Sequence, residues 1–199
     1  MQSLLNSLLS FFRTLFCSDL QEELDWYEQQ LLQIHKQSAQ LSKPCKRLKH
    51  LKNKLKTISL SELSTLFKSY KIPVFYIADK EYYTLPAKLF KQAINWLWKD
   101  FKVSYPFKYK EEVFDCDNYS LAFVFCSQQS CYYNDFQRQL AIGVAWSTIH
   151  AFNIFITQER EIYVFEPQNG FLAKYDLDEQ TAKKLGDYYF PICEIWFPG

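Results

Sequence analysis

Glycine and histidine are both scarce in this sequence, which limits the turns and the metal sites that it can form. Only 4 of the 199 residues are glycine, and all four fall at or after Gly143. Glycine supplies the positive φ angles of many tight turns, so we expect helices in the glycine-free part and turns after it. No two cysteines form a C-x-x-C pair, and no histidine is near the close pair Cys126 and Cys131. A zinc site is therefore not expected.

A surplus of charge of either sign is also missing. The 23 basic and 22 acidic side chains leave a formal net charge of +1, which gives no overall attraction to nucleic acid. A basic run at residues 46–56 has two interpretations: the solvated face of an amphipathic helix, or a patch for phosphates or anionic lipid. No aromatic residue interrupts the run, so base stacking there is not supported. We do not expect nucleic acid as a partner.

A secretory signal and a membrane-spanning segment are not evident. The apolar stretch at residues 3–16 contains Arg13, and neither a preceding basic residue nor a following cleavage site accompanies it. It is also shorter than the roughly 20 residues that cross a bilayer as a helix. Because the chain is 48% hydrophobic and has ample core residues, the six cysteines are interpreted as reduced thiols. These features predict a cytoplasmic protein.

The N-terminal third is predicted to be helical. Apolar residues recur at helical spacing in two segments before Pro44, which ends the second of them. The apolar face of residues 3–34 fits self-association into a homo-oligomer or docking on a membrane surface, which would make the protein peripheral. We therefore divide the chain into a helical segment, residues 1–71, and a second domain, residues 72–199.

Helices and strands are mixed in the rest of the chain, which predicts an α+β fold. Serines at 59 and 61 are candidate caps of a helix ending at Tyr70, and Thr84 is a candidate cap of a helix running to about Phe101. A further helix begins near Cys116. Segments rich in β-branched and aromatic residues predict strands at 74–77, 141–146, 151–157, 162–166 and 192–197.

Cys116 is the candidate nucleophile. It follows Asp115, a favoured N-cap residue, so it would occupy the first helical turn, where unpaired amides and the helix dipole stabilise a thiolate. Cys126 and Cys193 have apolar surroundings typical of buried cysteines. His150 is the only imidazole after residue 50, so any cysteine–histidine chemistry here must use it.

Glu166 is the candidate group that orients His150. If the isoleucines and valine of strands 151–157 and 162–166 face one core, Ile156 pairs with Ile162 and Ile154 with Val164. Extending this register brings His150 and Glu166 diagonally together on one face. Each residue taken alone is more typical of an ordinary structural position. Their order along the chain favours a shared site.

These segments resemble the papain-like superfamily, and more closely the C-terminal protease domain of fungal lectins such as the Marasmius oreades agglutinin and related phage and bacterial proteins. The resemblance covers residues 72–197. It is carried by Phe114-Asp115-Cys116-Asp117-Asn118-Tyr119, by His150-Ala151-Phe152-Asn153 and by Phe165-Glu166-Pro167-Gln168. It implies a papain-like fold, in which the helix that carries the nucleophile packs on an antiparallel sheet.

The resemblance also implies roles for single residues. Cys116 would be the nucleophile, His150 the base and Glu166 the orienting acid of a cysteine protease acting on a peptide or protein substrate. Gln168 is a candidate for the oxyanion hole, and Asn153 for a supporting position. By similarity the domain would be calcium-activated, and the available oxygen ligands are those of Asp115, Asp117 and Glu166.

Two departures from the family pattern matter. Asn118 stands where relatives often carry a second acid, which weakens the case for a metal, and no sugar-binding repeat precedes the domain, so lectin activity is not expected to transfer. The alternative function is a catalytically silent scaffold that serves as a binding or interaction module.

Overall fold

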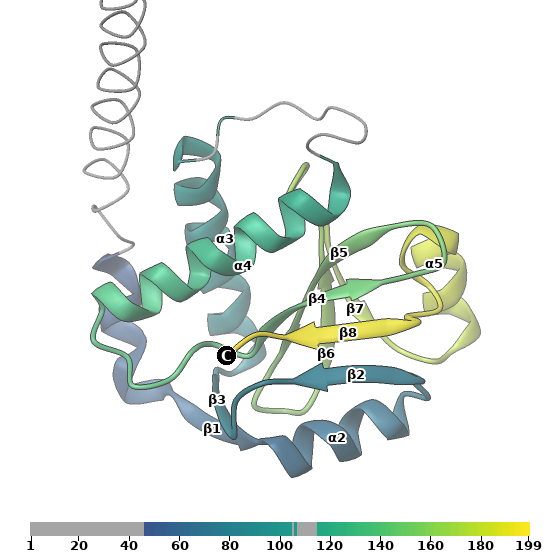
Figure 1. Ribbon diagram of the computed structural model, residues 1–199, viewed down its shortest axis with the longest axis horizontal. Helices are drawn as coiled ribbons and strands as arrows, with labels where there is room; N and C mark the ends of the chain where they lie inside the picture. The colour runs from purple at the N-terminus through teal and green to yellow at the C-terminus, as the bar shows by residue number, and fades with distance from the viewer. Residues whose placement is uncertain (1–45, 105, 107–114) are drawn as a thin grey trace, which may run out of the picture. The chain divides into compact units, whose positions relative to one another are not determined.

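The computed structural model describes residues 46–104, 106 and 115–199 (Figure 1). The two predicted helices before Pro44, with the oligomer or membrane role of residues 3–34, lie outside these residues. Among the described helices, none is long and apolar enough to cross a membrane. The elements in chain order are η1 (Lys46–Lys54), β1 (Lys56–Ser59), α2 (Leu60–Ser69), β2 (Val74–Ile77), β3 (Glu81–Thr84), α3 (Ala87–Ser104), α4 (Cys116–Tyr133), β4 (Ile142–Trp146), β5 (Ala151–Ile156), β6 (Ile162–Phe165), β7 (Leu172–Tyr175), α5 (Glu179–Tyr189) and β8 (Glu194–Phe197).

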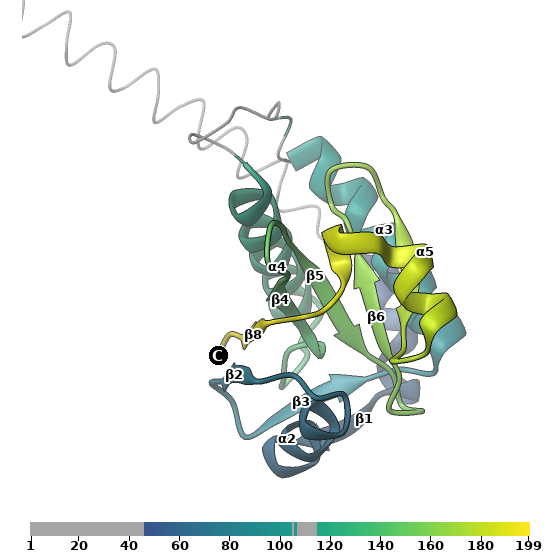
Figure 2. The same cartoon turned by 90° about the vertical axis from the view of Figure 1, so that its right-hand side faces the viewer.

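The predicted α+β class is confirmed. Six strands form one sheet in the order β2-β8-β4-β5-β6-β7, and β1 pairs with β3 in a separate two-stranded sheet. The larger sheet is mixed rather than purely antiparallel, because β2 runs parallel to β8 while the other neighbours are antiparallel. The helix α2 packs beside β2 (Figure 2), and α5 packs beside β7.

The basic run forms a short 3-10 helix whose leucines are buried. Leu48 and Leu51 are 0% and 6% exposed, whereas Arg47, Lys49 and Lys52 face solvent. Buried leucines beside exposed lysines are the pattern of an amphipathic helix with a solvated face, and the patch for phosphates or anionic lipid stays a prediction. The compact unit extends over Pro44–Gly199, and β1 pairs with β3 inside it, so the boundary predicted at residue 71 falls within this unit.

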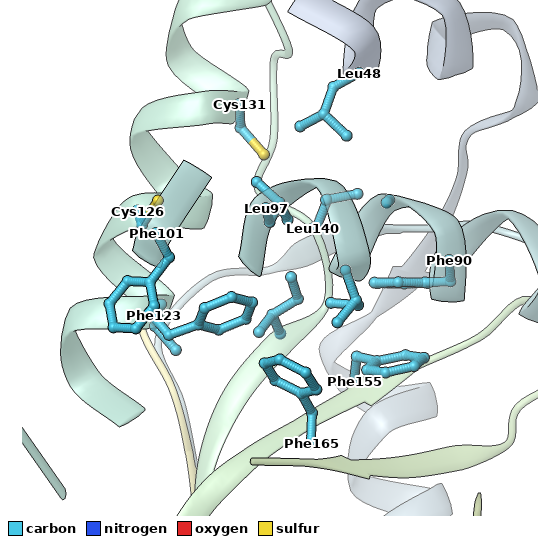
Figure 3. Close-up of a cluster of buried hydrophobic side chains, with 14 of the residues drawn as sticks. Leu48, Phe90, Leu97, Phe101, Phe123, Cys126, Cys131, Leu140, Phe155 and Phe165 are labelled. Atoms are coloured by element: carbon cyan, nitrogen blue, oxygen red, sulfur yellow. The ribbon is translucent and has the colours of Figure 1, made fainter. Parts of the chain in front are cut away.

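Alternate residues of the central strands face two separate cores. Phe155 of β5 and Phe165 of β6 pack with α3 and α4, and the ring of Phe123 on α4 lies 4.8 Å from that of Phe165 (Figure 3). Phe152, Ile154 and Val164 point the other way and pack with α2 and α5. Every β5 side chain is buried, because helices cover both faces of this strand.

Several local predictions are confirmed and several elements were missed. Ser59 caps α2 in a reciprocal capping box with Glu62, and β2 spans the predicted residues. Thr84 is instead the last residue of β3, and its buried hydroxyl donates to the carbonyl oxygen of Lys56 at 3.1 Å. The strands β1, β3 and β7 and the helix α5 were not predicted: each of the strands has only four residues, and Gly186, which has a positive φ, interrupts the helix.

Candidate functional site

Cys116 is the first residue of α4, as the sequence predicts. Asp115 precedes it as an extended N-cap residue, and its N–H donates to the Asn118 side-chain oxygen at 3.3 Å. The capping residues therefore place the Cys116 thiol at the end of the helix that meets the start of β5. A backbone hydrogen bond links the thiol to Ala151, the residue after His150.

The Cys116 thiol lies among groups that raise its pKa and groups that lower it. Burial raises its pKa above the ordinary cysteine value, and the carboxylates of Asp117 and Asp115 raise it further, against the lowering effect of the Ala151 amide. The Sγ atom lies 3.7 Å from the Asp117 Oδ1 atom, to which it donates. The role of Cys116 as a nucleophile stays a prediction.

His150 and Glu166 meet as the predicted register requires. Ile154 pairs with Val164 and Ile156 with Ile162, which confirms the expected pairing. The Nε2 atom of His150 lies 2.5 Å from the Glu166 Oε2 atom, and their side chains are 9% and 4% exposed.

The imidazole is held by aromatic rings rather than by the thiol. The ring centroid of His150 lies 4.9 Å from that of Tyr188, 5.7 Å from that of Tyr189 and 6.1 Å from that of Phe152. Within the described ranges the thiol is hydrogen-bonded to Asp117 and to backbone amides, and the imidazole is not among its partners. Burial and the Glu166 carboxylate raise the pKa of Tyr189 to about 12.

The candidate supporting residues make structural contacts. Asn153 is fully buried, and its amide nitrogen donates to the carbonyl oxygens of Ser120 in α4 at 2.9 Å and Gly143 in β4 at 3.2 Å. The N–H of Gln168 donates to the Glu166 Oε1 atom at 3.2 Å. Asn153 thus ties the helix that carries Cys116 to the sheet, and the oxyanion role of Gln168 stays a prediction.

Two of the three predicted metal ligands lie together. Side-chain atoms of Asp115, Cys116 and Asp117 all lie within 4.8 Å of one another, while both Glu166 oxygens accept hydrogen bonds elsewhere. One carboxylate oxygen of Asp115 is buried and has no hydrogen-bond partner. The hydrogen bond that protonated Asp117 donates to the Asp115 carboxylate raises the pKa of Asp117, and burial raises it further. Two adjacent carboxylates repel each other, whereas both can coordinate a hard cation such as Ca²⁺ through their oxygens.

Sequence reasoning missed a concave site that does not include Cys116, His150 or Glu166. A hollow of about 1100 Å³ lies between the last turns of α4, the loop that follows it and the β2–β3 turn. We name it the α4-end hollow. Its lining is amide-rich and aromatic: Ser59, Ala78, Asp79, Lys80, Glu81, Gln128, Gln129, Cys131, Tyr132, Tyr133, Phe136, Gln137, Arg138 and Gln139. The doublet of tyrosines near a predicted helix end was the one signal that could have indicated it.

Comparisons with known proteins identify lectin-type relatives. The family profile described as the ricin-type beta-trefoil lectin C-terminal domain matches residues 53–181. Two solved structures share the fold, each with a TM-score of 0.53 over 71% of this chain. The first is the PSL1a-E64 complex, at 20% identity and 51% coverage of its chain. The second is Polyporus squamosus lectin bound to the human-type influenza-binding epitope Neu5Aca2-6Galb1-4GlcNAc, at 18% identity and 49% coverage.

The chain thus spans about half the length of these two lectin chains. The comparison with curated proteins found no significant match.

These findings confirm the lectin-related resemblance and correct its protease part. The matched family is a lectin-type family and one structural neighbour is a lectin bound to a glycan, which contradicts the predictions of a hydrolase and a cysteine (thiol) protease. A peptide substrate has no support, and a papain-like fold is not established by these neighbours. The reason is that a cysteine, a histidine and an acid in this order along a chain do not by themselves distinguish an enzyme from a binding protein with the same fold.

Proposed function

Because the chain belongs to the family of ricin-type beta-trefoil lectin C-terminal domains, we propose that it is a carbohydrate-binding module rather than an enzyme. The Polyporus squamosus lectin binds a sialylated trisaccharide, and this chain is similar to about half of that protein. Glycan recognition is accordingly the function that the relatives suggest for it. The sequence left open a binding or interaction module as its alternative, without naming a glycan as the ligand.

The observation that carries the proposal is the family match over residues 53–181. In the structure the Cys116 thiol hydrogen-bonds to the Asp117 carboxylate, while the His150 imidazole bonds to Glu166 and packs against tyrosines. The buried hydrogen bond between His150 and Glu166 links the residue before β5 to the residue after β6. Such a bond stabilises the sheet, which a binding protein also requires.

Calcium is a candidate ligand of this scaffold. The carboxylates of Asp115 and Asp117 would hold it. One Asp115 oxygen is buried without a hydrogen-bond partner, and the neighbouring Asp115 raises the pKa of Asp117. When bound, the ion would neutralise both carboxylates and stabilise the start of α4. Glu166 would remain with His150 and would not serve as a ligand.

Two measurements test the proposal. The full chain is applied to an array of uncharged and sialylated glycans, beside a Cys116→Ala variant, and both should bind the same glycans with affinities within about twofold of each other. In addition, Cys116 should react with iodoacetamide at pH 7 no faster than Cys193, which is also partly exposed. Absence of glycan binding would refute the module, and rapid labelling of Cys116 that depends on His150 would restore the enzyme reading.

A further inference from the structure

The basic run at residues 46–56 concentrates the positive charge of the chain. Six of the 23 basic side chains fall within it and no acidic side chain does, although the formal net charge of the whole chain is only +1. The run comprises η1, Leu55 and the first residue of β1. Among the described residues, the ion pairs all join side chains outside the run. Its charge is therefore not neutralised within the described structure.

The 3-10 geometry of η1 sorts the side chains of the run onto separate faces. Such a helix has about three residues per turn and rises about 2 Å per residue, so residues three apart in sequence form a column with a spacing of about 6 Å. Leu48 and Leu51 share one column and are buried. Lys49 and Lys52 share the next column and are exposed, as is Arg47 in the third. We call Lys49 and Lys52 the lysine column.

The backbone of the basic run is held in place by the rest of the fold. Leu48 packs in the core cluster that α3 and α4 contribute to (Figure 3). The Lys54 carbonyl oxygen accepts a hydrogen bond from the Gln158 side chain at 2.7 Å, and Lys56 pairs with Thr84 at the start of the two-stranded sheet. A surface whose backbone is already ordered loses little conformational entropy when its side chains meet a partner.

The carboxylates that the fold brings toward the run have other partners. Glu159 is adjacent to Gln158, and its Oε2 atom accepts a hydrogen bond from the N–H of Ala87 at 3.0 Å. Glu62, in the first turn of the helix that follows β1, pairs with Arg160. The fold thus leaves the charge of the lysine column to be balanced by solvent ions or by an external anionic partner.

The composition and shape of the basic run favour an anionic lipid surface over a nucleic acid. Five of its six cations are lysines, which act as point charges, whereas bidentate recognition of single phosphates is typical of arginine. It has no aromatic residue for base stacking, and the α4-end hollow and the hollow beside α2 are lined by other residues. A membrane offers mobile anionic headgroups to such a row of point charges, and each basic residue near it strengthens binding by about fivefold.

We propose that the basic run docks the chain on an anionic lipid surface, with the lysine column and Arg47 against the headgroups. This inference does not depend on carbohydrate binding, because it assigns a different partner to a different surface. It is also distinct from membrane docking by the apolar face of residues 3–34. The lysine column binds through charge, and the leucines of the run stay in the core.

Co-sedimentation of the full chain with lipid vesicles tests the proposal. We expect binding to vesicles that contain phosphatidylserine, and none to vesicles of phosphatidylcholine alone. Binding should be lost between about 0.1 M and 1 M salt, because the Debye length falls from about 10 Å to about 3 Å.

A pair of double variants locates the binding surface. Lys49→Gln with Lys52→Gln should weaken binding to the phosphatidylserine vesicles by about 25-fold, which is about fivefold for each charge. Lys68→Gln with Lys71→Gln is the matched control, since it removes two exposed lysines at the far end of α2 and should change binding by less than about twofold. The urea midpoint should be the same in both, because all four side chains are exposed.

Four outcomes would overturn the proposal. No binding to the phosphatidylserine vesicles would remove it outright. Equal loss of binding in the two double variants would show that the position of the charges does not matter. Binding to phosphatidylcholine alone that survives high salt would assign the interaction to apolar residues. Binding of a fluorescein-labelled DNA duplex that depends on the lysine column, without vesicle binding, would assign the run to nucleic acid. Glycan binding should be the same in both double variants, so this test and that of the proposed function can fail separately.

Discussion

Replacing Glu166 with alanine tests whether the buried pair at the end of β6 is a structural fastening. Glu166 is 3% exposed and accepts hydrogen bonds from the His150 ring and from the Gln168 N–H. It also hydrogen-bonds with Tyr189, whose half-buried hydroxyl can turn to water after the substitution. The imidazole, 9% exposed, cannot do so. Leaving a buried polar group without its partner costs about 1–3 kcal/mol.

We therefore expect Glu166→Ala to lower the free energy of unfolding by about 3 kcal/mol. For a domain of this size that corresponds to a fall in melting temperature of roughly 6–12 °C. Urea unfolding followed by tryptophan fluorescence would measure it, since the chain has 5 tryptophans.

Two controls define the effect. Glu166→Gln keeps the shape and one acceptor and should lose about 1 kcal/mol. Glu161→Gln removes a half-exposed pair with Lys174, 3.0 Å long, and should lose no more than about 1 kcal/mol. A loss below about 0.5 kcal/mol in Glu166→Ala would refute the structural role. A double variant with His150→Ala should show a coupling of about 1–3 kcal/mol between the two residues.

Three further substitutions test the capping box, the acidic pair and the central sheet. Ser59→Ala removes the cap of α2 and should cost about 1 kcal/mol of unfolding free energy in urea. Hydrogen bonds from Ser59 lower the pKa of Glu62, so the stabilisation by Glu62 is present above its ordinary pKa of 4.5 and is lost as the pH falls through the folded-state pKa. The gap between wild type and Glu62→Gln should shrink in acid, and a constant gap from pH 7 to pH 3 would contradict this assignment. The pKa of Asp117 is raised, so its pH dependence is opposite to that of Glu62. The stability that protonated Asp117 contributes is lost as the pH rises through its folded-state pKa. Asp117→Asn should stabilise the chain by a few tenths of a kcal/mol at neutral pH and not in acid, and calcium should raise the melting temperature of wild type but not of this variant. Gly143→Ala places a methyl group 2.7 Å from the Trp196 carbonyl oxygen and should lower the free energy of unfolding by about 1–3 kcal/mol. A variant as stable as wild type would contradict this, because it would show that β4 and β8 can move apart to admit the methyl group.

Local sequence patterns determined the parts of the site that depend on neighbours along the chain. The N-cap residue Asp115 set the start of α4, and the alternation of Ile154 and Ile156 with Ile162 and Val164 set the register that brings His150 to Glu166. A one-residue slip would turn the apolar residues of both strands away from their core, so the buried pattern alone specifies the pairing.

Tertiary structure decided the chemistry of the site and the place of the hollow. The pKa of Cys116 follows from its burial and from the carboxylates packed beside it, and these cannot be weighed until the fold fixes the distances. Asn153 could be named from the sequence, but its task of holding α4 on the sheet depends on a face that only packing reveals. The α4-end hollow joins residues 59, 78–81 and 128–139, and no local pattern records that three distant segments meet. Short-range preferences thus fix elements and register, whereas burial and charge at a site are sums over neighbours that the chain brings together only when it folds.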